Sequence, residues 1–302
     1  MPAKQFRGIF GIPATPFNED ETIDTRSLES VLNFTVESGC HGMAVPVMAS
    51  EYQSLTDDER KLIVETAVRV VNGRVPVVAG VSGVSNIHSI ALARHAEDAG
   101  ADAVIALPPF SLPPSPAEVE RFFLQLGAAV GIPVFIQNHP AGYPLSAEAL
   151  ARICRARPNV FYIKEETRFA GRTATRAMEL AGDACPGVMG GMSCRFLISE
   201  YRRGECGNMP GSHWGDVVSV IWNRLEAGDE AGARQMHTRL LPLLNFELMN
   251  GMPAFKEVLV RRGVIATATV RSPGRHDLDR HDMEELGILM AEVRDLLTWR
   301  PG

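Results

Sequence analysis

The sequence predicts an α/β fold: a (β/α)8 TIM barrel over residues 1–215, followed by a C-terminal helical extension over residues 216–302. Two observations favour this fold. Short apolar segments rich in valine, isoleucine and phenylalanine recur at a steady spacing, and segments with a helical period separate most of them. After residue 211 the helical segments follow one another without clear strands between them. A chain of 302 residues suits one large domain of this kind.

Eight segments are expected to form the strands of the barrel. The first six show little polar alternation, as strands that are buried on both faces require. The last two are rich in glycine and would be weak predictions on their own. In chain order the segments are 8–14, 42–47, 75–81, 102–109, 132–138, 160–164, 187–191 and 206–211.

Helices are predicted between these strands and beyond them. One begins with Thr56 and carries Glu59 three residues later, which is the pattern of a capping box. A glycine follows each of the next helical segments at the C-cap position. A doubly wound sheet is the competing layout, but no Gly-x-Gly-x-x-Gly segment follows an early strand. The predicted helices are 25–39, 56–73, 85–100 and 115–131 in the barrel and 215–229, 230–249, 252–264 and 280–299 in the extension.

Composition narrows the class of protein. The net charge of −6 and the lack of a basic cluster argue against nucleic acid as the main partner. No apolar run has the length of a signal peptide or of a membrane span. The five cysteines form no Cys-x-x-Cys pair, which fits buried free thiols in a reducing compartment. These features predict a soluble, cytoplasmic protein without a membrane partner.

A lysine at the end of an apolar strand is the main chemical signal. Residues 160–163 run directly into Lys164, and Glu165, Glu166 and Thr167 follow. The active site of a (β/α)8 barrel is built from the C-terminal ends of its strands, and Lys164 is the only lysine directly after a predicted strand. Desolvation there disfavours the ammonium form, and a neutral amine can attack a ketone to form a Schiff base.

Several segments together resemble the dihydrodipicolinate synthase and N-acetylneuraminate lyase family of class I (Schiff-base) lyases. The resemblance covers nearly the whole chain, including the helical extension. It implies that Lys164 is the Schiff-base lysine, that no metal or other cofactor is needed, and that the protein forms a tetramer. The segments are GIPATPF (11–17), SEYQSLTDDER (50–60), GRVPVVAGV (73–81), GADAVIALPP (100–109), QNHP (137–140) and the lysine of the sixth strand.

The chain also departs from the aldolase members of that family. They carry Gly-Thr-Thr-Gly-Glu after the second strand, where residues 47–51 here read Val-Met-Ala-Ser-Glu. They carry a tyrosine near the asparagine of the fifth strand, where Gln137 and His139 flank Asn138, and a second tyrosine where Phe110 stands. A Tyr–Thr–Tyr proton relay therefore cannot be drawn, which disfavours the synthase and the neuraminate lyase.

A narrower branch of the family fits better. The segments after the second, fifth and sixth strands resemble the L-2-keto-3-deoxyarabonate dehydratases, which dehydrate 2-keto-3-deoxy sugar acids. The residues that carry this resemblance are Ser50, Glu51, Gln137, Asn138, Lys164, Glu166 and Thr167. The resemblance implies a small-molecule 2-oxo acid as the substrate.

The predicted reaction is the dehydration of a 2-keto-3-deoxy sugar acid, giving a 2-oxo acid semialdehyde. Glu166 is the candidate for the proton steps, because strand alternation places it on the same side as Lys164 if the extended chain persists. The alternative for Glu166 is an exposed loop carboxylate, and for Ser50 a turn or cap residue. His139 is expected to be a surface imidazole. The expected substrate-binding residues are Ala49, Ser50, Phe110, Gln137, Asn138, Thr167, Gly190 and Met209.

Other functions remain open at this point. A pyruvate-dependent aldolase or a deaminase of a cyclic imino acid could use the same lysine. A non-catalytic barrel that binds a 2-oxo acid is the alternative from a different class, since a fold alone does not fix a function. A buried amine beside a carboxylate argues against this last alternative.

Overall fold

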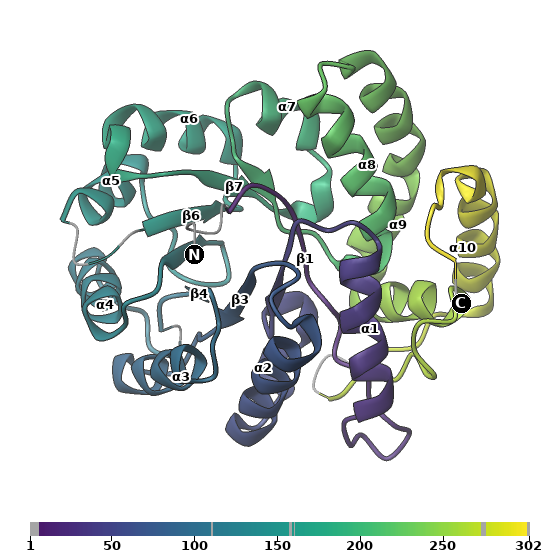
Figure 1. Ribbon diagram of the computed structural model, residues 1–302, viewed down its shortest axis with the longest axis horizontal. Helices are drawn as coiled ribbons and strands as arrows, with labels where there is room; N and C mark the ends of the chain where they lie inside the picture. Colours follow the sequence, from purple (N-terminus) through teal and green to yellow (C-terminus); the bar gives the residue numbers. More distant parts are fainter. Residues whose placement is uncertain (1–5, 110, 157–158, 160, 273–275, 301–302) are drawn as a thin grey trace.

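The computed structural model describes residues 6–109, 111–156, 159, 161–272 and 276–300. Eight parallel strands form a closed barrel in which each strand pairs with its neighbours in the chain and β8 pairs with β1 (Figure 1). This arrangement confirms the predicted (β/α)8 fold. The strands are β1 (Gly8–Gly11), β2 (Gly42–Val45), β3 (Val77–Gly80), β4 (Ala103–Ala106), β5 (Val134–Asn138), β6 (Phe161–Glu165), β7 (Val188–Gly190) and β8 (Gly207–Asn208).

The two glycine-rich segments do form strands, although short ones. Gly207 shows why glycine is needed there, since a Cβ at this position would lie 2.1 Å from the carbonyl oxygen of Gly8. The missing side chain lets β8 approach β1 and close the barrel. Apart from Tyr162, every strand residue is buried, which explains the near-continuous apolar runs in the sequence.

Helices surround the barrel. The capping box predicted for the second helix is present, with the Thr56 hydroxyl accepting from Glu59 N–H and the Glu59 carboxylate accepting from Thr56 N–H. Gly73 and Gly100 adopt the left-handed conformation after α2 and α3, as predicted. Gly131 does not, because α4 ends through Val130 in extended backbone. The barrel helices are α1 (Thr25–Glu37), α2 (Asp57–Val71), α3 (Asn86–Asp98), α4 (Pro116–Ala129), α5 (Ala147–Ala156), α6 (Ala170–Ala181), α7 (Leu197–Arg202) and α8 (Gly215–Glu226).

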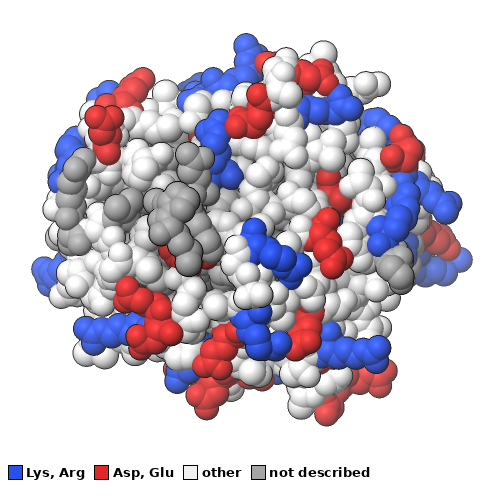
Figure 2. Space-filling view, viewed as in Figure 1, with Lys and Arg blue, Asp and Glu red and all other residues white. Residues whose placement is uncertain are grey.

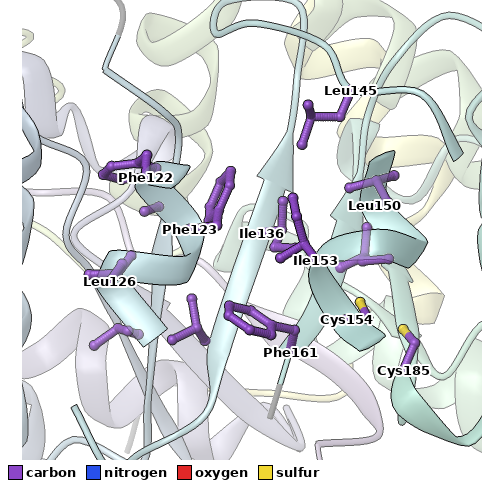
Figure 3. Packing of buried hydrophobic residues seen from close by; sticks show 14 of the residues in the cluster. Phe122, Phe123, Leu126, Ile136, Leu145, Leu150, Ile153, Cys154, Phe161 and Cys185 are labelled. Carbon is purple, nitrogen blue, oxygen red and sulfur yellow. The ribbon is translucent and has the colours of Figure 1, made fainter. Parts of the chain in front are cut away.

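The largest apolar cluster lies between the barrel wall and its outer helices. Phe123 of α4 points toward Ile136 of β5, Phe122 lies farther out on the same helix, and Phe161 of β6 lies below them beside α5 (Figure 3). All four of these side chains are at most 1% exposed. Burial of a large apolar side chain contributes roughly 1.5–3 kcal/mol, so this cluster holds the sheet and its helices at fixed positions.

The predicted extension, residues 216–302, begins within α8, and in its described part α8 is followed by the helices α9 (Glu230–Arg261) and α10 (Arg280–Glu292). α8 packs against both β1 and α9, and α9 packs against α10 (Figure 1). The two helices predicted at 230–249 and 252–264 are both present within α9, and they meet at Gly251, whose φ of 56° and ψ of −139° are not helical. Pro253 follows this break and lacks the N–H that a continuous helix would use.

Short 3-10 turns connect some strands to their helices. They include η1 (Met48–Ser50), η2 (Tyr52–Ser54), η4 (Met192–Cys194) and η5 (Ser212–Trp214). Basic and acidic side chains are interspersed over the face in Figure 2 without a large patch of one sign. Among the described residues, no helix is both long and apolar enough to cross a bilayer.

Candidate active site

Lys164 lies at the C-terminal end of β6 and is 3% exposed. The parallel register places it opposite Gln137 of β5. Its Nζ atom lies 2.9 Å from Oε2 of Glu166. A buried ammonium requires a partner of opposite charge, and Glu166 supplies one at hydrogen-bonding distance.

Glu166 continues the extended chain beyond β6. Its N–H donates to the carbonyl of Asn138 at 2.8 Å, so the strand alternation persists and its side chain falls on the same side as Lys164, as predicted. Gln137 Nε2 donates to Oε2 at 2.9 Å. A Cβ on Gly191 would lie 2.1 Å from Oε1, so the carboxylate occupies space that only glycine leaves open.

The pKa of Glu166 is lowered. Burial by itself would raise it, but the positive charge of Lys164 and the hydrogen bond from Gln137 outweigh the burial. The group is therefore a carboxylate at neutral pH, able to accept a proton. Glu166 is 9% exposed and is not a loop carboxylate in water.

Glu165 points to the opposite side of the strand and accepts hydrogen bonds from two of the residues predicted to bind substrate. Asn138 Nδ2 donates to Glu165 Oε2 at 2.7 Å, and Asn138 also exchanges hydrogen bonds with the backbone of Leu145. Both the N–H and the hydroxyl of Thr167 donate to Glu165 Oε1. Asn138 and Thr167 thus hold the loops after β5 and β6.

The loop after β2 presents backbone rather than side chains. The Ser50 hydroxyl donates to the carbonyl of Pro13 at 2.7 Å and is fully buried, which matches the turn role considered for it. The N–H groups of Met48 and Ala49, at the start of η1, donate to no acceptor within the described part of the chain. Glu51 follows in the left-handed conformation and lies 2.5 Å from Lys256 Nζ.

A cavity of about 270 Å³ opens beside Lys164. It brings together five of the predicted site residues, while Ser50, Asn138, Thr167 and Gly190 are not among the residues that line it. Phe110 lies outside the described residues. The predicted residues that line the cavity are Ala49, Gln137, Lys164, Glu166 and Met209.

His139 also lines this cavity, although a surface position was expected. Burial lowers its pKa, which favours the neutral imidazole. The expectation failed because the loop after β5 folds back: the Ala141 N–H donates to His139 Nδ1 at 2.9 Å.

Sequence reasoning missed part of the cavity lining that follows β7 and part that comes from α9. Three successive residues of η4 have positive φ: Met192 (52°), Ser193 (53°) and Cys194 (63°). Such residues store roughly 1–3 kcal/mol of strain each and cluster at functional sites. Arg195 follows them. The other missed residues are Glu247, Leu248, Gly251, Met252 and Phe255 of α9. Gly251 and Pro253, which indicate a break in the helix, were the one feature of the sequence that pointed to this part of α9.

None of the four tyrosines lines the cavity, and all four lie in the described part of the chain. The sequence indicated that a tyrosine relay is absent, and the residues that line this cavity agree with that. Among the described residues, no group of three or more histidine, cysteine, aspartate or glutamate side chains is placed to hold a metal ion.

Comparison with known proteins decides the family. The model of the dihydrodipicolinate synthetase family matches residues 5–287. The chain belongs to this family. Its closed barrel resembles the crystal structure of YagE, a prophage protein of the same family from Escherichia coli K12 in complex with pyruvate. The TM-score is 0.89 at 25% identity, covering 96% of this chain and 99% of that one.

Two curated relatives differ in the reaction that their names describe. An L-2-keto-3-deoxyarabonate dehydratase from Azospirillum brasilense is 32% identical over 274 residues, 88% of each chain. A probable 2-dehydro-3-deoxy-D-pentonate aldolase from Escherichia coli K12 is 27% identical over 245 residues, 80% of this chain and 81% of the relative. The chain is thus a lyase of the dihydrodipicolinate synthetase family.

Proposed function

We propose that this protein is a Schiff-base dehydratase of a 2-keto-3-deoxy sugar acid such as L-2-keto-3-deoxyarabonate. One observation carries the proposal: Lys164 Nζ lies 2.9 Å from Glu166 Oε2, in a cavity where no tyrosine is available, among the described residues, to relay protons. The similarity to the dehydratase of Azospirillum brasilense supports it.

The first step is attack of the Lys164 amine on the C2 ketone. Glu166 can take the proton of the Lys164 ammonium at 2.9 Å, which frees the lone pair of the nitrogen. The N–C bond forms, the carbonyl oxygen leaves as water, and a protonated imine results. No metal or other cofactor is required in this proposal, because the imine itself serves as the electron sink.

The second step is elimination across C3 and C4. The imine acidifies the C3–H bond, and the Glu166 carboxylate removes that proton. The resulting enamine expels the C4 hydroxyl, which takes up a proton and leaves as water. Hydrolysis of the imine frees Lys164. In a five-carbon substrate, tautomerisation of the released product converts the terminal CH2OH to an aldehyde, so the net change is the loss of one water.

The proposed site for the substrate carboxylate is η1. Met48 and Ala49 line the cavity, their N–H groups donate to no acceptor among the described residues, and Ala49 was predicted to bind substrate. Backbone N–H groups bind anionic oxygens well, particularly away from bulk water. Gln137 lies opposite Lys164 in the register and orients Glu166.

Borohydride trapping with pyruvate tests the Schiff base. Intact mass and peptide mapping should find a stable adduct confined to Lys164 and lost in Lys164→Ala. No adduct, or adducts spread over surface lysines, would refute the mechanism. A non-catalytic barrel that binds a 2-oxo acid would then be the better interpretation. Product analysis then separates the reactions on this scaffold: a dehydratase gives a semialdehyde with no carbon lost, an aldolase releases pyruvate, and a deaminase releases ammonia.

The proposal includes a homo-oligomer, with a tetramer as the state that the family resemblance implies. Two aromatic side chains beside α6 and α7 support it, since Phe169 is 63% and Phe196 55% exposed. They line a hollow with Arg168, Arg172 and Arg203. Exposed aromatic and arginine side chains are enriched where proteins associate.

A further inference from the structure

In the carboxylate of Glu247, in α9, one oxygen has hydrogen-bond partners and the other has none among the described residues. Its Oε1 accepts from Trp214 Nε1 at 2.6 Å and lies 2.8 Å from His213 Nε2. Its Oε2 is buried and has no hydrogen-bond partner within the described residues. Glu247 is 1% exposed and lines the cavity that contains Lys164. A buried polar atom without a partner destabilises the fold, and a ligand group would relieve that penalty.

Arg195 lines the same cavity and shows the same asymmetry. Its Nη1 donates to the carbonyl of Met192 at 2.8 Å, and its Nη2 donates to the carbonyl of Leu244. Its Nε is buried and has no partner among the described residues. Each terminal nitrogen carries a second N–H, whereas the single N–H of the buried Nε is the one that has no partner at all.

We infer that Glu247 Oε2 and Arg195 Nε form a subsite for the terminal hydroxyl of the substrate. This inference rests on the proposed function, and it narrows the substrate class to sugar acids that end in a hydroxyl. A hydroxyl donates one hydrogen bond and accepts others, which matches one unpaired acceptor and one unpaired donor. A terminal carboxylate has acceptors only and would leave Glu247 Oε2 without a donor, so it fits this subsite less well.

The fold holds this subsite rigidly. Trp214 and His213 belong to η5, directly after β8, and fix the carboxylate from behind. The His213 ring stacks on Phe255 of α9, with the ring centroids 4.4 Å apart. The break at Gly251 separates Glu247 from Phe255, so both halves of α9 face the cavity. The proposed subsite thus takes its acceptor from α9 and its donor from the segment after β7, while β6 supplies the lysine.

The test measures how well compounds compete with pyruvate for Lys164. For each, the concentration that halves the rate of pyruvate trapping is determined with the wild-type protein. Three are compared: a 2-keto-3-deoxypentonate, its analogue with hydrogen in place of the terminal hydroxyl, and a 2-keto-3-deoxy acid with a terminal carboxylate. We expect the hydroxyl compound to compete about 10- to 100-fold better than the deoxy analogue, the range for a hydrogen bond to a charged group. The carboxylate compound should also lack the advantage of the hydroxyl compound, because it has no donor for Glu247 Oε2.

The variant Glu247→Gln should abolish most of the advantage of the hydroxyl compound over the deoxy analogue, with both compounds measured against the variant's own rate of pyruvate trapping. Glu230→Gln, on the same helix at an exposed position, is the matched control and should behave as the wild type. Equal competition by the hydroxyl and deoxy compounds in the wild-type protein would overturn the inference while the Schiff base stands. A wild-type protein that does not trap pyruvate would refute the proposed function and this inference with it.

Discussion

Replacing Glu166 with glutamine isolates the proposed proton transfer. The amide has nearly the shape of the carboxylate, so the site keeps its packing against Gly191 and a hydrogen bond with Gln137. What it loses is the basic oxygen 2.9 Å from Lys164. A placed general base contributes about 10²- to 10⁴-fold to the rate. At about 1.36 kcal/mol for each factor of ten, this is roughly 2.7–5.4 kcal/mol of the activation barrier.

The assay for Glu166→Gln follows kcat for loss of water from a 2-keto-3-deoxy sugar acid, together with pyruvate trapping. We expect kcat to fall by about 10²- to 10⁴-fold while Lys164 still forms a borohydride-stable adduct. Glu165→Gln is the matched control, because Glu165 is a buried neighbour that points to the other side of β6. A Glu166→Gln variant with kcat within tenfold of the wild type would refute the role given to Glu166.

The pH profile gives an independent check on the same residue. The charge of Lys164 and the hydrogen bond from Gln137 lower the pKa of Glu166 despite its burial. The base is active when deprotonated, so activity should fall with decreasing pH only below the ordinary glutamate pKa of 4.5. An acid limb from Glu166 above that value, absent in Glu166→Gln, would contradict the electrostatic description of the site.

Two further predictions concern groups outside the proposed chemistry. Lys256→Met should lower the free energy of unfolding by about 3–5 kcal/mol, because it leaves the carboxylate of the buried Glu51 without its cation. Unfolding in denaturant should show that adding Glu51→Gln restores part of this loss. Full additivity of the two changes would argue against the ion pair. Glu205 is 2% exposed, and burial raises its pKa to about 9. The folded state then binds this proton more tightly than the unfolded state, so stability should fall as pH rises from about 4.5 towards 9. Thermal unfolding of Glu205→Gln should depend less on pH over that range, and an unchanged slope would contradict the assigned pKa.

The sequence predicted where the strands and the lysine would lie, for a physical reason. A parallel strand buried on both faces must be apolar along its length, so the strands stand out as short runs of valine, isoleucine and phenylalanine. A polar or charged residue directly after such a run falls at the mouth of the barrel. This rule predicts Lys164 as a site residue, and the spacing between Lys164 and Glu166 predicts that both side chains lie on the same side of the strand.

The polar residues around Lys164 were harder to assign, because the direction of a side chain near a strand end depends on register. Gln137 and Asn138 are neighbours in the chain, yet Gln137 contacts Glu166 and Asn138 contacts Glu165. Shifting a strand by one residue exchanges the two faces. The sequence identified the group of residues, and only the pairing of β5 with β6 decided which of them face the cavity.

The part of the cavity lining that comes from α9 was decided by tertiary structure alone. Glu247 stands 83 positions beyond Lys164 in a helical segment whose own pattern shows only that it is a helix. It reaches the cavity because α9 packs against α8 and breaks at Gly251. Local sequence patterns report which residues are buried, but contacts between distant segments depend on how whole elements pack. The amine and its carboxylate could thus be predicted from the chain, whereas the groups proposed to select the substrate could not.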